Sequence, residues 1–180
     1  IFDELISNDR IIGGLNKKSA LLAKYLYQSF VKGRFFITDA RTAELSKLVE
    51  NSFRDVNIAF ANELSEICEE KNIDVLEVIN LANKHPRVNI LEPGPGVGGH
   101  CIPIDPWFII SSFKTNTSLI ESARKVNDKK PTLIVKKINN SIKKIRLTSR
   151  KIKVGIFGLA YKPNSDDLRE SPSLEIIKKI

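Results

Sequence analysis

The sequence lacks methionine, has no long apolar run and is poor in glycine and proline. Crossing a bilayer takes about 18 consecutive apolar residues, whereas the longest apolar run, around Trp107 to Ile110, has only the length of a strand. Glycine and proline number 9 and 8, which excludes a collagen-like chain. With 42% apolar and 28% charged residues, the composition is that of a folded globular protein without a membrane partner.

Cysteine is also scarce. Cys68 and Cys101 cannot form a disulfide framework and do not have the spacing of a zinc site, so a cytoplasmic protein without a bound metal is expected. Because the chain begins at Ile1 and contains no methionine, it is interpreted as an internal piece of a longer polypeptide. A targeting segment or further domains would then lie outside these 180 residues.

The formal net charge of +8 is unevenly distributed. Residues 124–162 contain 13 Lys or Arg residues and one acid, Asp128. Such a block attracts polyanions, from nucleic acids to nucleotide diphosphates. A basic nucleic-acid-binding helical module is therefore one hypothesis. The sequence shows no motif that recognises bases, so a nucleic-acid partner is not expected.

The first part of the chain alternates strand and helix patterns. Residues 11–14 and 35–38 have the character of strands, and a helix pattern runs from 17 to about 31. This alternation predicts an α/β fold with a parallel sheet. Residues 1–40 are accordingly interpreted as the C-terminal end of an α/β domain whose glycine-rich nucleotide fingerprint would precede Ile1.

The middle of the chain is predicted to be helical. The strongest helix signal covers 42–71, where the larger apolar side chains fall on one stripe that we expect to be buried: Val49, Phe53, Val56, Phe60, Leu64 and Ile67. A second helix is predicted at 75–83, and a long basic helix begins near Leu119 and is kinked or interrupted at Pro131. Residues 41–150 are interpreted as this helical domain.

A second α/β unit is predicted to begin in residues 151–180. A strand at 152–157 is followed by a loop and then by a helix. Ser171 is expected to cap that helix and Pro172 to occupy its first position.

Cys101 follows a segment of closely spaced glycines and prolines at 94–99. Such a loop exposes backbone N–H groups to an anion or a developing oxyanion, as a reactive cysteine requires. The alternative is a structural turn before a small packed thiol. The loop is not a P-loop, because no Gly-Lys-Ser/Thr follows, nor a dinucleotide fingerprint, because no strand and helix flank it. Cys68, at the edge of the apolar stripe, is expected to pack in the core.

Three polar residues share the face of the 42–71 helix opposite the stripe, at positions i, i+4 and i+7: Lys47, Asn51 and Arg54. Spacing alone leaves two interpretations. The face is either solvated, or covered by a second element that brings Cys101 to it. Asp105, four residues after Cys101, is positioned either to orient a water or to form an Asx turn.

With these residues assembled, the chain resembles the UDP-glucose/GDP-mannose dehydrogenase family. The resemblance rests on blocks that follow the family's order along nearly the whole sequence: 42–57, 85–89, 94–106, 158–163 and 167–172. It implies an N-terminal NAD-binding Rossmann domain, a central all-helical dimerisation domain and a C-terminal Rossmann-like UDP-binding domain. Family members oxidise a sugar alcohol to a carboxylate with two NAD⁺ and one water, in polysaccharide biosynthesis.

The resemblance also implies roles for individual residues. Cys101 would be the nucleophile that forms a thiohemiacetal and then a thioester. Lys47 and Asn51 would stabilise the oxyanion, Lys47 would also transfer protons, and Asp105 would help to activate the hydrolytic water. A further set would hold the UDP-sugar: Arg54, His85, Arg87, Gly98, Tyr161 and Lys162. Arg169 matches a position that approaches NAD.

The expected substrate is UDP-N-acetyl-D-mannosamine, because His100 and the block at 85–87 resemble those of N-acetylhexosamine enzymes. UDP-N-acetylglucosamine and UDP-glucose are the alternatives. At least a homodimer is expected through the 42–71 helix. Since the NAD fingerprint and most of the UDP domain are missing, the fragment is expected to be inactive by itself.

Overall fold

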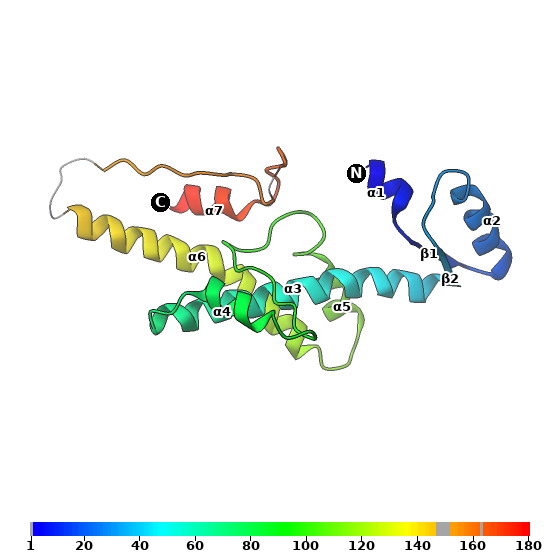
Figure 1. The fold of residues 1–180 in the computed structure, drawn as a ribbon, viewed down its shortest axis with the longest axis horizontal. Coiled ribbons are helices and arrows are strands. Elements are labelled where there is room, and N and C mark those ends of the chain that lie inside the picture. Colours follow the sequence, from blue (N-terminus) through cyan, green and yellow to red (C-terminus); the bar gives the residue numbers. More distant parts are fainter. Residues whose placement is uncertain (1, 147–151, 163) are drawn as a thin grey trace. The chain divides into compact units, whose positions relative to one another are not determined.

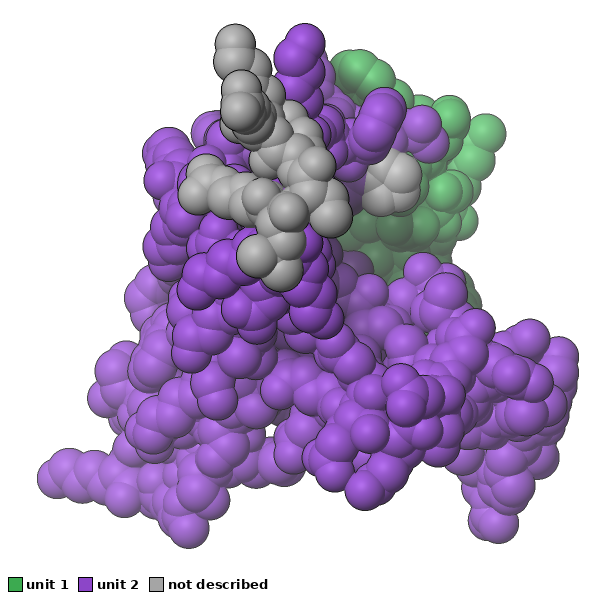
Figure 2. Space-filling view, turned by 90° about the vertical axis from the view of Figure 1, so that its left-hand side faces the viewer, with its two compact units in different colours: residues 1–50 green, residues 51–180 purple. Residues whose placement is uncertain are grey.

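The computed structural model describes residues 2–146, 152–162 and 164–180. The chain divides into two compact units, residues 1–50 and 51–180, which are coloured separately in Figure 2. The predicted domain boundary at 150–151 lies outside the described residues. Among the helices that the structure describes, none combines the length and the apolar composition that crossing a membrane requires.

The first unit contains the predicted parallel strand pair. Helix α1 (Phe2–Ser7) precedes β1 (Arg10–Gly14), α2 (Lys17–Tyr27) and β2 (Phe35–Asp39), and β1 pairs with β2 in parallel. A capping box between Asn16 and Ser19 begins α2. This helix ends at Tyr27, four residues earlier than predicted.

Helices dominate the rest of the chain (Figure 1). Helix α3 (Ala40–Glu70) begins in the first unit, and α4 (Val75–Ala82), α5 (Asp105–Ser112), α6 (Ser118–Arg146) and α7 (Pro172–Lys179) follow. The fold is therefore rich in helix with a small parallel sheet. Helix α6 packs against both α5 and α7 and continues through Pro131, which does not interrupt it.

The apolar stripe of α3 is largely exposed, so the prediction that it is buried is wrong for this chain. Four of its members are at least 50% exposed: Val49, Phe53, Phe60 and Ile67. The opposite face is buried instead, and its side chains are small or polar: Asn51, Ser52, Asp55, Ala59 and Asn62. Periodicity identifies the apolar face of a helix but not the element that packs against it. Here α6 forms hydrogen bonds with the polar face.

Two local predictions also differ from the structure. Residues 152–157 are not a strand, because no neighbouring strand in the described chain supplies the hydrogen bonds that define one. Ser171 occupies the N-cap of α7 and Pro172 its first position, as predicted. The Ser171 hydroxyl does not cap the helix, however, since it donates to the carbonyl of Leu159 at 2.5 Å.

Candidate active site

The loop between α4 and α5 needs glycine for two separate reasons (Figure 1). Gly96 and Gly99 have φ angles of 138° and 88°, which side-chain-bearing residues rarely adopt. At Gly98 the constraint is space: a Cβ would lie 2.5 Å from the Tyr161 Cβ and 2.8 Å from the Glu170 carbonyl oxygen. The loop that carries Cys101 is therefore packed directly against residues that follow the basic helix.

Cys101 lies near the end of this loop, four residues before α5 begins. Its carbonyl accepts hydrogen bonds from the backbone N–H groups of Ile104, at 3.1 Å, and Asp105, at 2.8 Å. Its side chain is exposed, whereas Cys68 is buried, which confirms the prediction that Cys68 packs in the core. Of these two thiols, only that of Cys101 is open to a substrate.

Helix α5 brings Asp105 to the polar face of α3. The Asn51 amide donates to Asp105 Oδ2 at 2.5 Å, although the two residues are 54 positions apart. Asn51 is only 5% exposed. Because Asp105 is the first residue of α5 and Cys101 precedes it by one helical turn, the same contact holds the start of α5, next to the thiol, against α3. At Asn51, therefore, the polar face of α3 is covered and not solvated.

Lys47 and Arg54 have exposed side chains on α3. Lys47 forms an ion pair with Glu50 at 3.0 Å and lines a cleft of about 820 Å³ within the first unit. Cys101 belongs to the second unit. The predicted meeting of the Lys47 amine with the Cys101 thiol stays a prediction.

The predicted UDP-sugar residues fall into two groups. His85 and Arg87 are exposed in the turn after α4, where the Arg87 N–H donates to His85 Nδ1 at 3.3 Å. Tyr161 packs on Gly98 and Gly99, and the Lys162 ammonium lies 5.8 Å from the centre of the Tyr161 ring. The second group, Tyr161 and Lys162, therefore contacts the glycine loop through Tyr161, and the Lys162 ammonium lies above the Tyr161 ring.

Arg169 is held by an acid that the sequence patterns did not identify. Asp167 accepts hydrogen bonds at 2.8 Å from both Nε and Nη2 of Arg169, in a bidentate pair. These hydrogen bonds hold the pKa of Asp167 well below its usual range. The Arg169 side chain remains 71% exposed, so its guanidinium is oriented but still accessible to an anion.

Two further contacts of the loop were also missed. Asn62 accepts a hydrogen bond from the Gly94 N–H at 2.9 Å, and a Cβ on Gly96 would lie 3.2 Å from both Pro131 and Pro172. The available signals were a polar residue in the interior of α3 and a proline within a strong helix pattern. Neither signal indicates which distant residue it contacts.

Models of protein families match two parts of the chain. Residues 41–129 match the central domain of the UDP-glucose/GDP-mannose dehydrogenase family, and residues 155–180 match its UDP-binding domain. The chain belongs to this family. The positions from Lys47 to Asp105 fall in the first match, and Tyr161, Lys162 and Arg169 fall in the second.

Individual family members resemble the whole chain. It is 56% identical over 180 residues to a UDP-N-acetyl-D-mannosamine dehydrogenase of Methanocaldococcus jannaschii, covering 100% of the chain and 41% of that protein. It is 53% identical over 178 residues to an NDP-N-acetyl-D-galactosaminuronic acid dehydrogenase of Ralstonia nicotianae, covering 99% of the chain and 41% of the relative. The chain thus spans about two fifths of the length of these curated relatives.

A solved structure of the family has the same fold. The UDP-D-ManNAc dehydrogenase of Pyrococcus horikoshii superposes with a TM-score of 0.92 at 47% identity, over 99% of this chain and 43% of that one. The helix-rich architecture with its small parallel sheet is therefore the architecture of a family member.

Proposed function

We propose that the whole protein containing this chain is an NAD-dependent UDP-sugar 6-dehydrogenase. Its substrate is UDP-N-acetyl-D-mannosamine, which it oxidises to UDP-N-acetyl-D-mannosaminuronate. The observation that carries the proposal is the pairing of Asn51 with Asp105 one helical turn from the exposed thiol of Cys101. The names and the identity of its relatives support the choice of substrate.

The proposed chemistry begins at the Cys101 thiol. The thiol adds to the aldehyde carbon of the half-oxidised sugar, and the aldehyde oxygen takes up a proton as the thiohemiacetal forms. The Asn51 amide and the Lys47 ammonium donate hydrogen bonds to the oxyanion that develops during this addition. Loss of a hydride and a proton from the thiohemiacetal leaves a thioester on Cys101.

Asp105 acts in the hydrolysis of that thioester. Its carboxylate accepts a hydrogen bond from Asn51 through Oδ2, which leaves Oδ1 to orient a water and take up its proton. Attack of the water on the acyl carbon breaks the C–S bond. The departing thiolate takes the proton from Asp105, which regenerates the Cys101 thiol, and the sugar carboxylic acid releases its own proton to the solvent.

Two molecules of NAD⁺, bound in succession, would each accept one hydride of the reaction. Among the described residues, the exposed guanidinium of Arg169, which Asp167 orients, fits an anionic dinucleotide. We infer that Arg169 contacts this cofactor. The 180 residues alone are expected to lack turnover, because the chain covers about two fifths of its relatives.

The remaining polar residues hold the UDP-sugar in this proposal. Lys162 and Tyr161 provide a cation beside an aromatic ring, a combination suited to a nucleotide diphosphate. Arg54, Gly98, His85 and Arg87 complete the set. The exposed apolar stripe of α3 supports assembly into a homodimer, because a patch of large apolar side chains is usually covered by a partner.

The proposal predicts the outcome of a substrate panel. The full-length enzyme, given NAD⁺ and UDP-N-acetylmannosamine, UDP-N-acetylglucosamine or UDP-glucose in parallel, should oxidise the first with a kcat/KM at least about tenfold higher. Absorbance of NADH gives the rate, and two NADH should form for each sugar consumed. No NADH from any of the three sugars, together with tight binding of generic DNA, would contradict the enzyme hypothesis in favour of the nucleic-acid module.

A further inference from the structure

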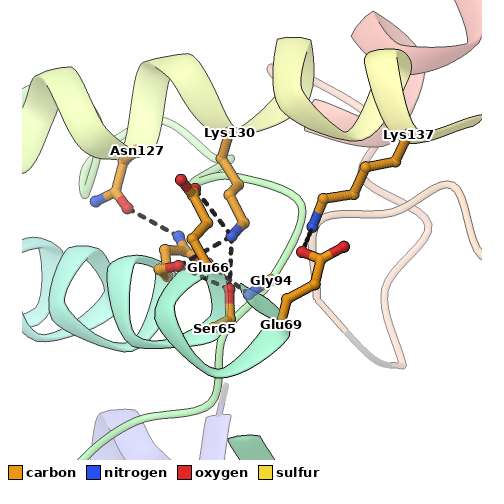
Figure 3. A network of polar contacts seen from close by, with 8 residues as sticks. Ser65, Glu66, Glu69, Gly94, Asn127, Lys130 and Lys137 are labelled. Carbon is orange, nitrogen blue, oxygen red and sulfur yellow. Dashed lines mark hydrogen bonds and ion pairs between the residues drawn. The ribbon is translucent and has the colours of Figure 1, made fainter. Parts of the chain in front are cut away.

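A chain of buried amides connects α6 to the beginning of the Cys101 loop. Asn62 on α3 is 0% exposed and Asn127 on α6 is 1% exposed. The Asn62 Nδ2 donates to Asn127 Oδ1 at 2.9 Å, while the Asn62 Oδ1 accepts from the Gly94 N–H at 2.9 Å. Figure 3 shows Asn127 reaching from α6 toward α3, with Gly94 beside the same group of side chains.

The orientation of the two buried amides is determined by the groups at both ends of this series of hydrogen bonds. Asn127 Nδ2 donates to the backbone oxygen of Asp55 at 3.0 Å and to its Oδ1 at 2.9 Å, and neither is a donor when the carboxylate is ionised. The Asn127 oxygen must therefore face Asn62. At the other end the Gly94 N–H can only donate. Rotating either amide by 180° would place donors against donors in a buried site.

Basic side chains of α6 also form hydrogen bonds with the residues of α3 that take part in this series. Arg124, 2% exposed, donates to Asp55 Oδ1 at 2.5 Å. Lys130, 5% exposed, donates to the Asn62 carbonyl at 2.9 Å and to Ser65 Oγ at 2.6 Å (Figure 3). Both the backbone and the amide of Asn62 are thus held from α6.

The first part of the loop has other supports. Asn57 of α3 accepts a hydrogen bond from the Leu91 N–H at 3.2 Å and donates to the Asn89 carbonyl at 3.1 Å, and Asn83 pairs with the backbone of Ile90. Residues 88–98 contain no helix or strand. The position of the segment that leads to Cys101 therefore depends on individual contacts. Asn62 holds Gly94, Pro131 and Pro172 pack at Gly96, and Tyr161 packs on Gly98 and Gly99. Among the described hydrogen bonds of residues 92–100, the one from the Gly94 N–H to Asn62 ties the loop to α3.

We propose that Asn62, oriented by Asn127, is a positioning residue for the oxidation: it holds the loop at Gly94 and thereby places the Cys101 thiol. The inference rests on the proposed function in one respect, that Cys101 is the nucleophile. Asn62 acts through the loop and not on the substrate itself. Its loss should therefore lower kcat and leave KM nearly unchanged.

The test uses the full-length enzyme with Asn62→Asp. This variant keeps the size of the side chain, but it places a carboxylate oxygen against Asn127 Oδ1, and the repulsion between these two acceptors should move the side chain away from the Gly94 N–H. The matched control is Val135→Ala, which removes a buried side chain of α6 that does not contact the loop through any described hydrogen bond. Melting temperatures identify any general loss of stability. All rates are measured below the melting temperature of the least stable protein.

Two readouts are expected to separate the variants. Asn62→Asp should lower kcat for the UDP-sugar by about 10- to 100-fold, because small displacements of a reacting group have effects of this size, with KM within about threefold of wild type. Hydrogen exchange at the Gly94 amide, followed by mass spectrometry of a peptide covering 92–101, should accelerate at least about tenfold. Val135→Ala should keep both kcat and the exchange rate within about twofold of wild type.

A double substitution tests the connection to Asn127. Since both amides act through one chain, Asn62→Ala combined with Asn127→Ala should lower kcat no further than Asn62→Ala alone, within about twofold. If the fold-losses of kcat from the two alanine substitutions multiply in the double variant, the positioning role is overturned. An Asn62→Asp enzyme that keeps its kcat while the wild type is active would also overturn that role, without affecting the proposed function. A wild-type enzyme that oxidises no UDP-sugar would instead contradict the proposed function, and the exchange rate at Gly94 would still show whether Asn62 holds the loop.

Discussion

Cys101→Ser in the full-length enzyme is expected to reduce the conversion of UDP-sugar to carboxylate by at least about a thousandfold. A serine hydroxyl has nearly the size of the thiol but is a far poorer nucleophile near neutral pH. Because the thiol is exposed at the end of its loop, the replacement disturbs no buried packing. Affinity for the UDP-sugar should therefore stay within about threefold of the wild-type value.

NADH formation measures the loss of conversion by Cys101→Ser, and calorimetric titration with the UDP-sugar measures its affinity. Cys68→Ala provides the matched thiol control, since Cys68 is buried near the C-terminal end of α3. It should lower the melting temperature somewhat and leave turnover within about twofold of wild type. Normal turnover by Cys101→Ser would remove the thioester step from the mechanism.

Gly98→Ala is expected to have the second large effect. The new Cβ would lie 2.5 Å from the Tyr161 Cβ and 2.8 Å from both the Glu170 carbonyl oxygen and Pro172 Cδ. These are backbone, ring and Cβ atoms, which cannot rotate away as the end of a flexible side chain can. The loop or the start of α7 must shift, at a cost of about 1–3 kcal/mol, and Cys101 follows three residues later.

We expect kcat/KM to fall by at least about a hundredfold, because displacement of the nucleophile adds to the loss of the Tyr161 contact. Gly155→Ala is the matched control: among the described residues, the nearest atom to its Cβ is Phe157 Cε2 at 3.8 Å, an ordinary contact. That variant should retain wild-type kinetics and melting temperature. Full activity of Gly98→Ala would mean that the loop and Tyr161 are not packed together in the working enzyme.

The regular elements of the chain could largely be predicted because they depend on local patterns. Alternating strand and helix signals predicted the parallel pairing of β1 with β2, and a solved structure of the family has the same helix-rich fold with a small parallel sheet. Helix α5 was missed. Its Asp105–Ser112 segment contains a continuous apolar run from Trp107 to Ile110, which shows no helical period, and the structure begins it with Asp105 and Pro106 at the first helical positions.

Packing partners were harder to predict than elements. The stripe on α3 was identified correctly as apolar, but its predicted burial is wrong because α6 contacts the polar face. That polar face contains Asp55 and Asn62, whose side chains form hydrogen bonds only when a particular residue of α6 lies opposite them. A helical period gives no information about such a partner.

The candidate site shows the same division. Spacing placed Lys47, Asn51 and Arg54 on one face but left open whether a second element covers it. The contact of Asn51 with Asp105 joins residues 54 positions apart, so no local pattern could predict it. The resemblance to the family supplied the expected roles, and the structure supplied the contacts of Gly98 with Tyr161 and of Arg169 with Asp167.

Mass spectrometry of the peptide that contains Cys101, sampled during turnover, tests the central claim most directly. Asp105→Asn keeps the shape of the side chain but removes the carboxylate that would activate water, so the thioester should accumulate. The full-length variant, mixed with NAD⁺ and UDP-N-acetylmannosamine and then acid-quenched, should show a UDP-sugar acyl adduct on the peptide that contains Cys101. An unmodified Cys101 throughout turnover, or an adduct on any other residue, would contradict the account.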